Sequence, residues 1–129
     1  MSKLYIYFLL LVFSINCYSQ SKGECLSNLS IFAEYAKVKN YEAAYEPWLK
    51  VKAECPDINS AIYVYGERIL KFYIKNSQGN EKDEYEEDLL DLYDEWLKYF
   101  SKTKSGMQQT GKILAIKAQS MLDYKLGDD

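Results

Sequence analysis

Apolar and polar residues follow a helical spacing along most of the chain. Apolar side chains recur every three or four residues, which places them on one face of an α-helix, and no segment alternates as a half-buried strand does. Turn-forming residues interrupt the pattern at Asn40, Pro56, 76–80 and Gly106. The predicted helices cover about residues 25–38, 41–54, 58–76, 82–102 and 107–125. We therefore predict an all-α fold.

Each predicted helix has its own set of apolar residues for a shared core. Pro47 lies inside the second helix and removes one backbone hydrogen bond there, so we expect a kink or a distorted turn at this position. The predicted apolar series are, helix by helix, Leu29, Phe32 and Ala36 with partners such as Ile31 and Tyr35; Tyr41, Ala44, Tyr45, Trp48 and Val51; Ile58, Ala61, Ile62, Tyr65, Ile69 and Phe72 or Tyr73; Tyr85, Leu89, Leu92, Tyr93, Trp96 and Phe100; and Ile113, Leu114, Ala118, Met121 and Leu122.

The first residues resemble an export signal. Lys3 precedes an apolar run, residues 4–13, which is followed by small and polar residues. The run is shorter than the roughly 20 apolar residues that a membrane span needs. We predict cleavage after Ser19 and export to the periplasm, to the outer membrane or outside the cell. Lipidation at Cys17 is an alternative, although the residues before Cys17 fit a lipoprotein signal poorly. The predicted divisions are a signal peptide at 1–19, a linker at 20–24 and one helical domain at 25–129.

Cleavage would leave two cysteines, Cys25 and Cys55, in an oxidising compartment. An even number of cysteines there predicts a disulfide, with two free thiols as the alternative. If the first two helices form an antiparallel hairpin that turns at Asn40, both sulfurs lie at the same end of the pair. A bridge closing a loop of this length stabilises the fold by roughly 3 kcal/mol.

Composition narrows the chemistry that the chain can perform. Without Lys3, 15 basic and 19 acidic residues remain, a net charge of −4, which argues against nucleic-acid binding. The chain contains no histidine, which removes the most common general base and metal ligand. We predict no catalytic residues, no metal and no cofactor, and therefore a protein that is not an enzyme.

An acidic stretch at 81–95 contains nine carboxylates and a single base, Lys82. A solvated helix face is the first interpretation, because acidic residues are favourable near a helix N-terminus. A docking patch for a basic partner is the second. A hydrolase using Asp88 and Asp91 is the third, but no second element is predicted to face this pair. The lysines from Lys98 to Lys117 are interpreted as surface residues, with binding to anionic envelope polymers as the alternative.

Residues 25–56 resemble a tetratricopeptide repeat (TPR). Aligning Pro56 with the closing proline of the repeat matches a pattern of apolar, aromatic and small positions. Phe32 occupies the usual glycine position and departs from the pattern. A second unit begins near Asn59, with Gly66 at its glycine position, and residues 107–126 open a third. The matching residues are Ile31, Tyr35, Ala44, Trp48 and Val51 in the first unit, and Ile62, Tyr65, Gly66 and Ile69 in the second.

The resemblance implies antiparallel helical hairpins stacked as a short α-solenoid, in an exported bacterial protein of which this chain is an N-terminal portion or a short form. It also implies a scaffold or adaptor of the cell envelope that binds a protein or peptide through a helix-lined surface. The alternative is a small disulfide-stapled secreted inhibitor or effector. In the family the first helix of each repeat lines the binding surface, and the matching candidates are Asn28, Glu34, Lys39, Tyr63, Glu67 and Arg68. The sequence does not predict the oligomeric state.

Overall fold

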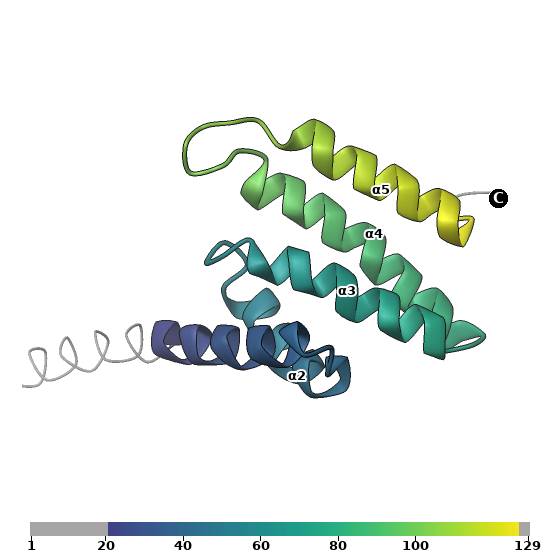
Figure 1. Ribbon diagram of the computed structural model, residues 1–129, viewed down its shortest axis with the longest axis horizontal. Coiled ribbons are helices and arrows are strands. Elements are labelled where there is room, and N and C mark those ends of the chain that lie inside the picture. Colours follow the sequence, from purple (N-terminus) through teal and green to yellow (C-terminus); the bar gives the residue numbers. More distant parts are fainter. Residues whose placement is uncertain (1–20, 127–129) are drawn as a thin grey trace, which may run out of the picture.

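The computed structural model describes residues 21–126, and most of them are helical (Figure 1). Within this part of the chain the only pairing of β type is an isolated bridge between Lys102 and Gln108. The predicted all-α class is therefore confirmed. The predicted signal peptide, including Cys17, lies outside the described residues. The helices are the first helix at 21–37, α2 at Tyr41–Glu54, α3 at Ala61–Asn76, α4 at Asn80–Phe100 and α5 at Thr110–Tyr124.

Predicted helix boundaries differ from the structure by up to four residues, and two of the differences change the assignment of a segment. Residues 21–24, assigned to a linker, belong to the first helix. Residues 107–109, assigned to the last helix, belong to the α4–α5 loop. There the backbone N–H of Gln109 donates to the carbonyl of Ser101 at 2.7 Å, and Gly106 has a φ of 83°. Residues 107–109 thus pair with 101–103 instead of continuing a helix, and α5 begins only at Thr110.

The first helix and α2 form the predicted antiparallel hairpin. Asn40 caps α2, because its side-chain oxygen accepts a hydrogen bond from the backbone N–H of Ala43 at 3.3 Å. A disulfide joins Cys25 and Cys55 at the open end, with 6.4 Å between their Cα atoms, as predicted. α2 continues through Pro47 to Glu54. The first hairpin is therefore closed at both ends.

Trp48 joins this hairpin to α3. Its indole N–H donates to the carbonyl of Ile62 at 2.8 Å, and the ring is buried. The ring lies directly over Gly66, where a Cβ atom would stand 2.7 Å from the indole nitrogen. Glycine is favoured at position 66 because any larger residue would force the Trp48 ring to move.

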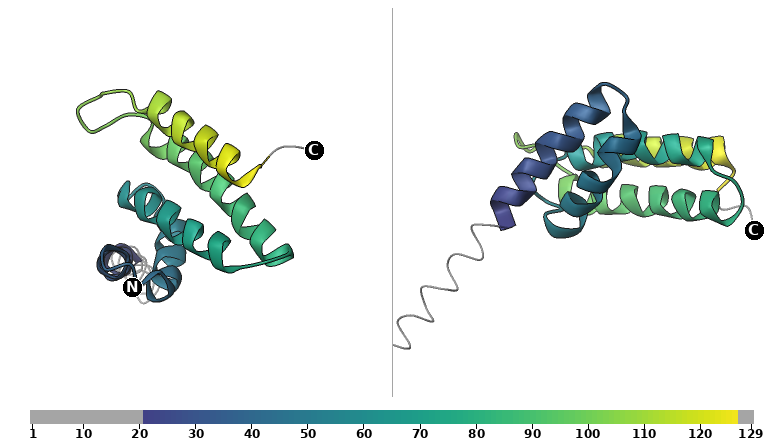
Figure 2. Two further views of the ribbon diagram at one scale, coloured as in Figure 1. Left: turned by 45° about the vertical axis from the view of Figure 1, so that its right-hand side comes forward. Right: turned by 90° about the horizontal axis from the view of Figure 1, so that it is seen from below.

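Helices α3, α4 and α5 lie side by side as an antiparallel layer, and the first hairpin packs against α3 at an incline to that layer (Figures 1 and 2). Between α3 and α4, the ring of Tyr63 stacks on Trp96 with 6.1 Å between centroids. The Tyr63 hydroxyl donates to the carbonyl of Pro56 at 2.8 Å. The described residues thus form five helices packed in sequence as a short helical stack.

The prediction for the buried face of α5 was largely wrong. Ile113 is buried as predicted, but Leu114 and Leu122 are 47% and 74% exposed. A different face packs on the core, and it carries Ile113, Ile116 and Tyr124. Two polar contacts to α4 lie on this face, and in the first the Lys117 ammonium lies 2.6 Å from an Asp94 carboxylate oxygen. The second contact is a 2.8 Å hydrogen bond between the hydroxyls of Ser120 and Tyr93.

Candidate functional site: a basic groove on α3

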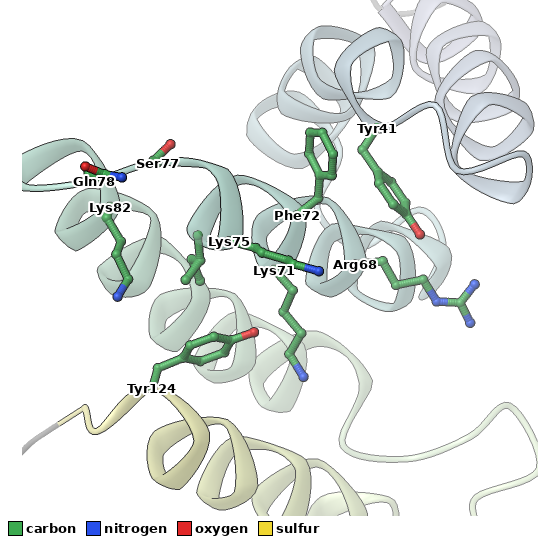
Figure 3. A pocket seen from close by; sticks show the side chains of 10 residues that line it. Tyr41, Arg68, Lys71, Phe72, Lys75, Ser77, Gln78, Lys82 and Tyr124 are labelled. Atoms are coloured by element: carbon green, nitrogen blue, oxygen red, sulfur yellow. The ribbon is translucent and has the colours of Figure 1, made fainter.

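An open groove of about 640 Å³ runs along the second half of α3 (Figure 3). Tyr41, at the start of α2, and Tyr124, at the end of α5, flank it on opposite sides of α3. Lys82, in the first turn of α4, lines the end of the groove near the α3–α4 turn. We call this surface the basic groove. Its remaining lining residues are Arg68, Lys71, Phe72, Ile74 and Lys75 of α3, followed by Ser77 and Gln78.

The lining of the basic groove carries one sign of charge. Arg68, Lys71 and Lys75 follow one another at three- and four-residue spacing, which places them on the same face of α3. Lys82 adds a fourth cation, and none of the lining residues within 21–126 is acidic. Along the helix axis, the three α3 cations span about 10 Å at 1.5 Å per residue. The groove is therefore a positively charged strip on a protein whose overall charge is negative.

Two of the four cations have carboxylate partners beside the groove. The Lys71 ammonium lies 2.7 Å from a Glu67 carboxylate oxygen, and Lys82 lies 3.4 Å from a buried oxygen of Glu86. Arg68 and Lys75 form no ion pair within residues 21–126, and both are exposed. The Arg68 guanidinium lies over the ring of Tyr65, 5.4 Å from its centroid. The charges of Arg68 and Lys75 are thus not compensated by a carboxylate of the described residues, and both are available to a ligand.

A hydrogen-bond network beside the groove links α3, α4 and α5. The Tyr93 hydroxyl donates to Glu67 at 3.1 Å, and it therefore accepts from the Ser120 hydroxyl at 2.8 Å. Burial raises the pKa of Tyr93, so the phenol stays protonated and can donate to Glu67 at neutral pH. Because the Glu67 carboxylate also pairs with Lys71, the network couples the position of a groove cation to the packing of three helices.

Tyr124 enters the groove as a neutral hydrogen-bond donor. Burial raises the pKa of its phenol above the ordinary value, and the nearby charges of Asp123, Glu67 and Glu86 raise it further, against the opposing effect of Lys71. Tyr124 therefore offers a ring face and an O–H group rather than a charge.

The structure places the predicted binding residues in three environments. Arg68 lines the groove, and Glu67 lies beside it, engaged with Lys71 and Tyr93. Tyr63 is fully buried, so it offers no surface to a partner in this structure. The candidates from the first hairpin, none of which lines the groove, are Asn28, Glu34 and Lys39. Glu34 pairs with Lys37 at 2.7 Å.

Most of the groove was missed by sequence reasoning. The sequence predicts Tyr41 as a core residue and Lys82 as the single base of an acidic stretch, and it predicts no role for Tyr124. The spacing of Arg68, Lys71 and Lys75 was a visible signal for a basic helix face. The sequence alone gave no sign that Tyr124, more than 40 residues after Lys82, lies beside this face.

Other surfaces of the described residues offer less for chemistry. They contain no group of three or more histidine, cysteine, aspartate or glutamate side chains placed to hold a metal ion. On α4, burial raises the pKa of Asp88, and the charge of Lys52 on α2 opposes that shift. Lys52 also bonds Glu95 at 3.1 Å, so part of the acidic stretch is compensated within the molecule.

No helix among residues 21–126 is both long enough and apolar enough to cross a membrane. Comparisons with models of protein families, with curated proteins and with solved structures found no significant match to this chain.

Proposed function

We propose that this protein is an exported interaction module that binds a protein or peptide partner on its helix-lined surface and acts as a scaffold or adaptor in the bacterial cell envelope. The observation that carries the proposal is the basic groove, because side chains from α2, α3, α4 and α5 converge on one open surface. A groove with aromatic walls and a few placed polar groups is a common form of binding site.

The stacking of the helices supports a TPR-like reading of the chain. Trp48 and Gly66 pack against each other across the boundary between the two units that the resemblance defines. The basic groove then lies on the first helix of the second unit, the helix that lines the binding surface in that family. The departure is in the first unit, where Ile31 and Tyr35 match core positions of the repeat but are each 41% exposed.

The disulfide supports export. Disulfides persist in oxidising compartments and are rare in the cytosol, and Cys25 and Cys55 are bridged. Export would bring the groove into contact with envelope or extracellular proteins.

Site-specific photo-crosslinking tests the proposed function. A photoreactive amino acid replaces Lys75 or Gln78, both exposed in the groove, or Lys50, an exposed residue of α2 outside it. We expect both groove positions to crosslink the same envelope protein in living cells and Lys50 to yield none of that product. Equal crosslinking at all three positions, or none in the groove, would contradict the proposal.

A further inference from the structure

We propose that the basic groove recognises an extended acidic segment of the partner, with two carboxylates about three residues apart and an aromatic side chain between them. This inference rests on the proposed function and adds the chemistry of the partner.

Charge identifies the ligand as an anion. Four cations line the groove, and Arg68 and Lys75 have no carboxylate partner within the described residues. Arg68 presents a planar fork of donors that matches a carboxylate in two parallel hydrogen bonds. Lys75 presents a mobile point charge at the other end of the strip.

Spacing gives the pattern of the segment. Arg68 and Lys75 are separated by seven residues of helix, about 10 Å along the axis. An extended peptide in the polyproline II conformation rises about 3.1 Å per residue with three residues per turn, so its residues i and i+3 lie on one face about 9 Å apart. Two carboxylates at that spacing can reach Arg68 and Lys75 together.

Aromatic side chains flank the path between these two cations. Tyr41 and Phe72 pack with 5.4 Å between ring centroids on one side, and Tyr124 lies on the other (Figure 3). Aromatic rings attract one another beyond the gain from burial, and Tyr124 can donate a hydrogen bond to the peptide backbone. An aromatic residue between the two acids therefore fits the groove better than a polar one.

The rest of the molecule favours a short peptide over an extended polyanion. The chain has a net charge of −3, and the acidic stretch at 81–95 begins beside Lys82 at the edge of the groove. A membrane surface or a long anionic polymer would be repelled by these carboxylates. A peptide of a few residues contacts the cations and extends no further.

Fluorescence anisotropy with a defined peptide tests the inference. The probe is a fluorescein-labelled peptide of about eight residues, with two glutamates three positions apart and a phenylalanine between them. The protein is residues 20–129 with the disulfide intact. We expect saturable binding that weakens as ionic strength rises from about 0.01 M to about 0.15 M. Replacing both glutamates by glutamine should abolish it, and replacing the phenylalanine by alanine should weaken it.

Two charge-reversal variants, one inside the groove and one outside it, show whether the binding is specific to the groove. R68E/K75E should lower the affinity by about tenfold or more, a change of about 1.4 kcal/mol. K50E/K112E changes the net charge equally at exposed lysines outside the groove and should leave the affinity within about twofold. R68Q/K75Q repeats the test without reversing charge, and circular dichroism of every variant checks that the helices are intact.

Four outcomes would overturn the inference. Equal losses of affinity in R68E/K75E and K50E/K112E would mean that peptide binding depends only on the net charge of the protein. Tighter, Arg68-dependent binding of anionic phospholipid vesicles would assign the groove to a membrane surface. Self-association that R68E/K75E abolishes, seen by sedimentation, would make a second copy the occupant. Groove-specific crosslinking without binding of the acidic peptide would reject this partner chemistry and leave the proposed function standing.

Discussion

Trp48 contributes to stability through two separate contacts. Its ring is buried against Gly66, and its indole N–H bonds to the carbonyl of Ile62 at 2.8 Å. Trp48→Ala should lower the free energy of unfolding by about 3–5 kcal/mol, because it leaves a large cavity between the first hairpin and α3. Urea unfolding followed by circular dichroism measures the loss, and a value below about 1 kcal/mol would contradict this packing.

Gly66→Ala tests the same contact from the α3 side. The added methyl would stand 2.7 to 2.9 Å from three atoms of the indole, so the ring must move and its hydrogen bond to Ile62 must lengthen. We expect a loss of about 1–3 kcal/mol. Gly111→Ala is the matched control, since nothing lies within 4 Å of its Cβ position in α5. Alanine there should be neutral or stabilise by up to about 1 kcal/mol, and similar effects at both sites would argue against close packing at Gly66.

At the residue scale, the sequence predicted the contacts for which only one residue type fits. The two cysteines are bridged and Trp48 is buried, as the sequence predicted. Ile31 and Tyr35 were harder to place, because the first helix has apolar residues around most of its circumference. Phe32 and Ala36 are buried against neighbouring helices, whereas no described helix covers the side with Ile31 and Tyr35.

The disulfide matters at the scale of the first hairpin. It ties the first helix to the end of α2, while Asn40 closes the other end. Replacing Cys25 and Cys55 by serine should lower the free energy of unfolding by about 3–4 kcal/mol, as for a bridged loop of this length.

The same double variant should exchange amide hydrogens faster in the first helix than in α4, since α4 is held by α3 and α5 on either side. Hydrogen exchange detected by mass spectrometry gives both rates. Equal acceleration in the first helix and in α4 would mean that the bridge stabilises the whole stack rather than the hairpin.

For α5, paired truncations show which face is buried. Ile113→Ala removes a fully buried side chain and should cost about 2–5 kcal/mol. Leu122→Ala truncates a side chain that is 74% exposed and should change stability by less than about 0.5 kcal/mol. Thermal and urea unfolding measure both, and a larger loss for Leu122→Ala would restore the face that the sequence predicted.

The error on α5 has a physical cause. Leucines and alanines surround this helix, so periodicity alone does not choose a face. The face that is buried carries Ile113 and Ile116 together with Lys117 and Ser120, which contact Asp94 and Tyr93 of α4. Pairs formed between helices depend on their register, which a single sequence does not show.

At the scale of the whole molecule, the basic groove also depends on how the helices pack against one another. The sequence predicted a basic residue, Arg68, on the surface of α3. The groove exists because the stack brings Tyr41 and Tyr124 to opposite sides of that helix. Helix number and order were therefore predictable, while the surface formed by helices distant in sequence required their packing.

The tyrosines of the core make the whole fold sensitive to alkali. Burial raises the pKa of Tyr45 to about 12 and raises that of Tyr63 and Tyr93 as well. An unfolded chain ionises its tyrosines near pH 10. Above about pH 10 the unfolded state therefore binds fewer protons than the native state, and stability falls as pH rises. Below about pH 10 both states keep the phenols protonated, so this contribution to stability is fully present there.

Urea unfolding at a series of values between about pH 8 and about pH 12 should show a plateau and then a decline. Each tyrosine with a raised pKa adds up to about 1.4 kcal/mol per pH unit to the slope. Tyr45→Phe should flatten the decline between about pH 10 and about pH 12 by up to that amount, because it removes one group that ionises only in the unfolded state. The tyrosinate absorbance of the native protein should rise at a higher pH than that of the urea-unfolded chain. Coincident titrations, or an unchanged slope in Tyr45→Phe, would show that these phenols are not buried as the packing of α2, α3 and α4 requires.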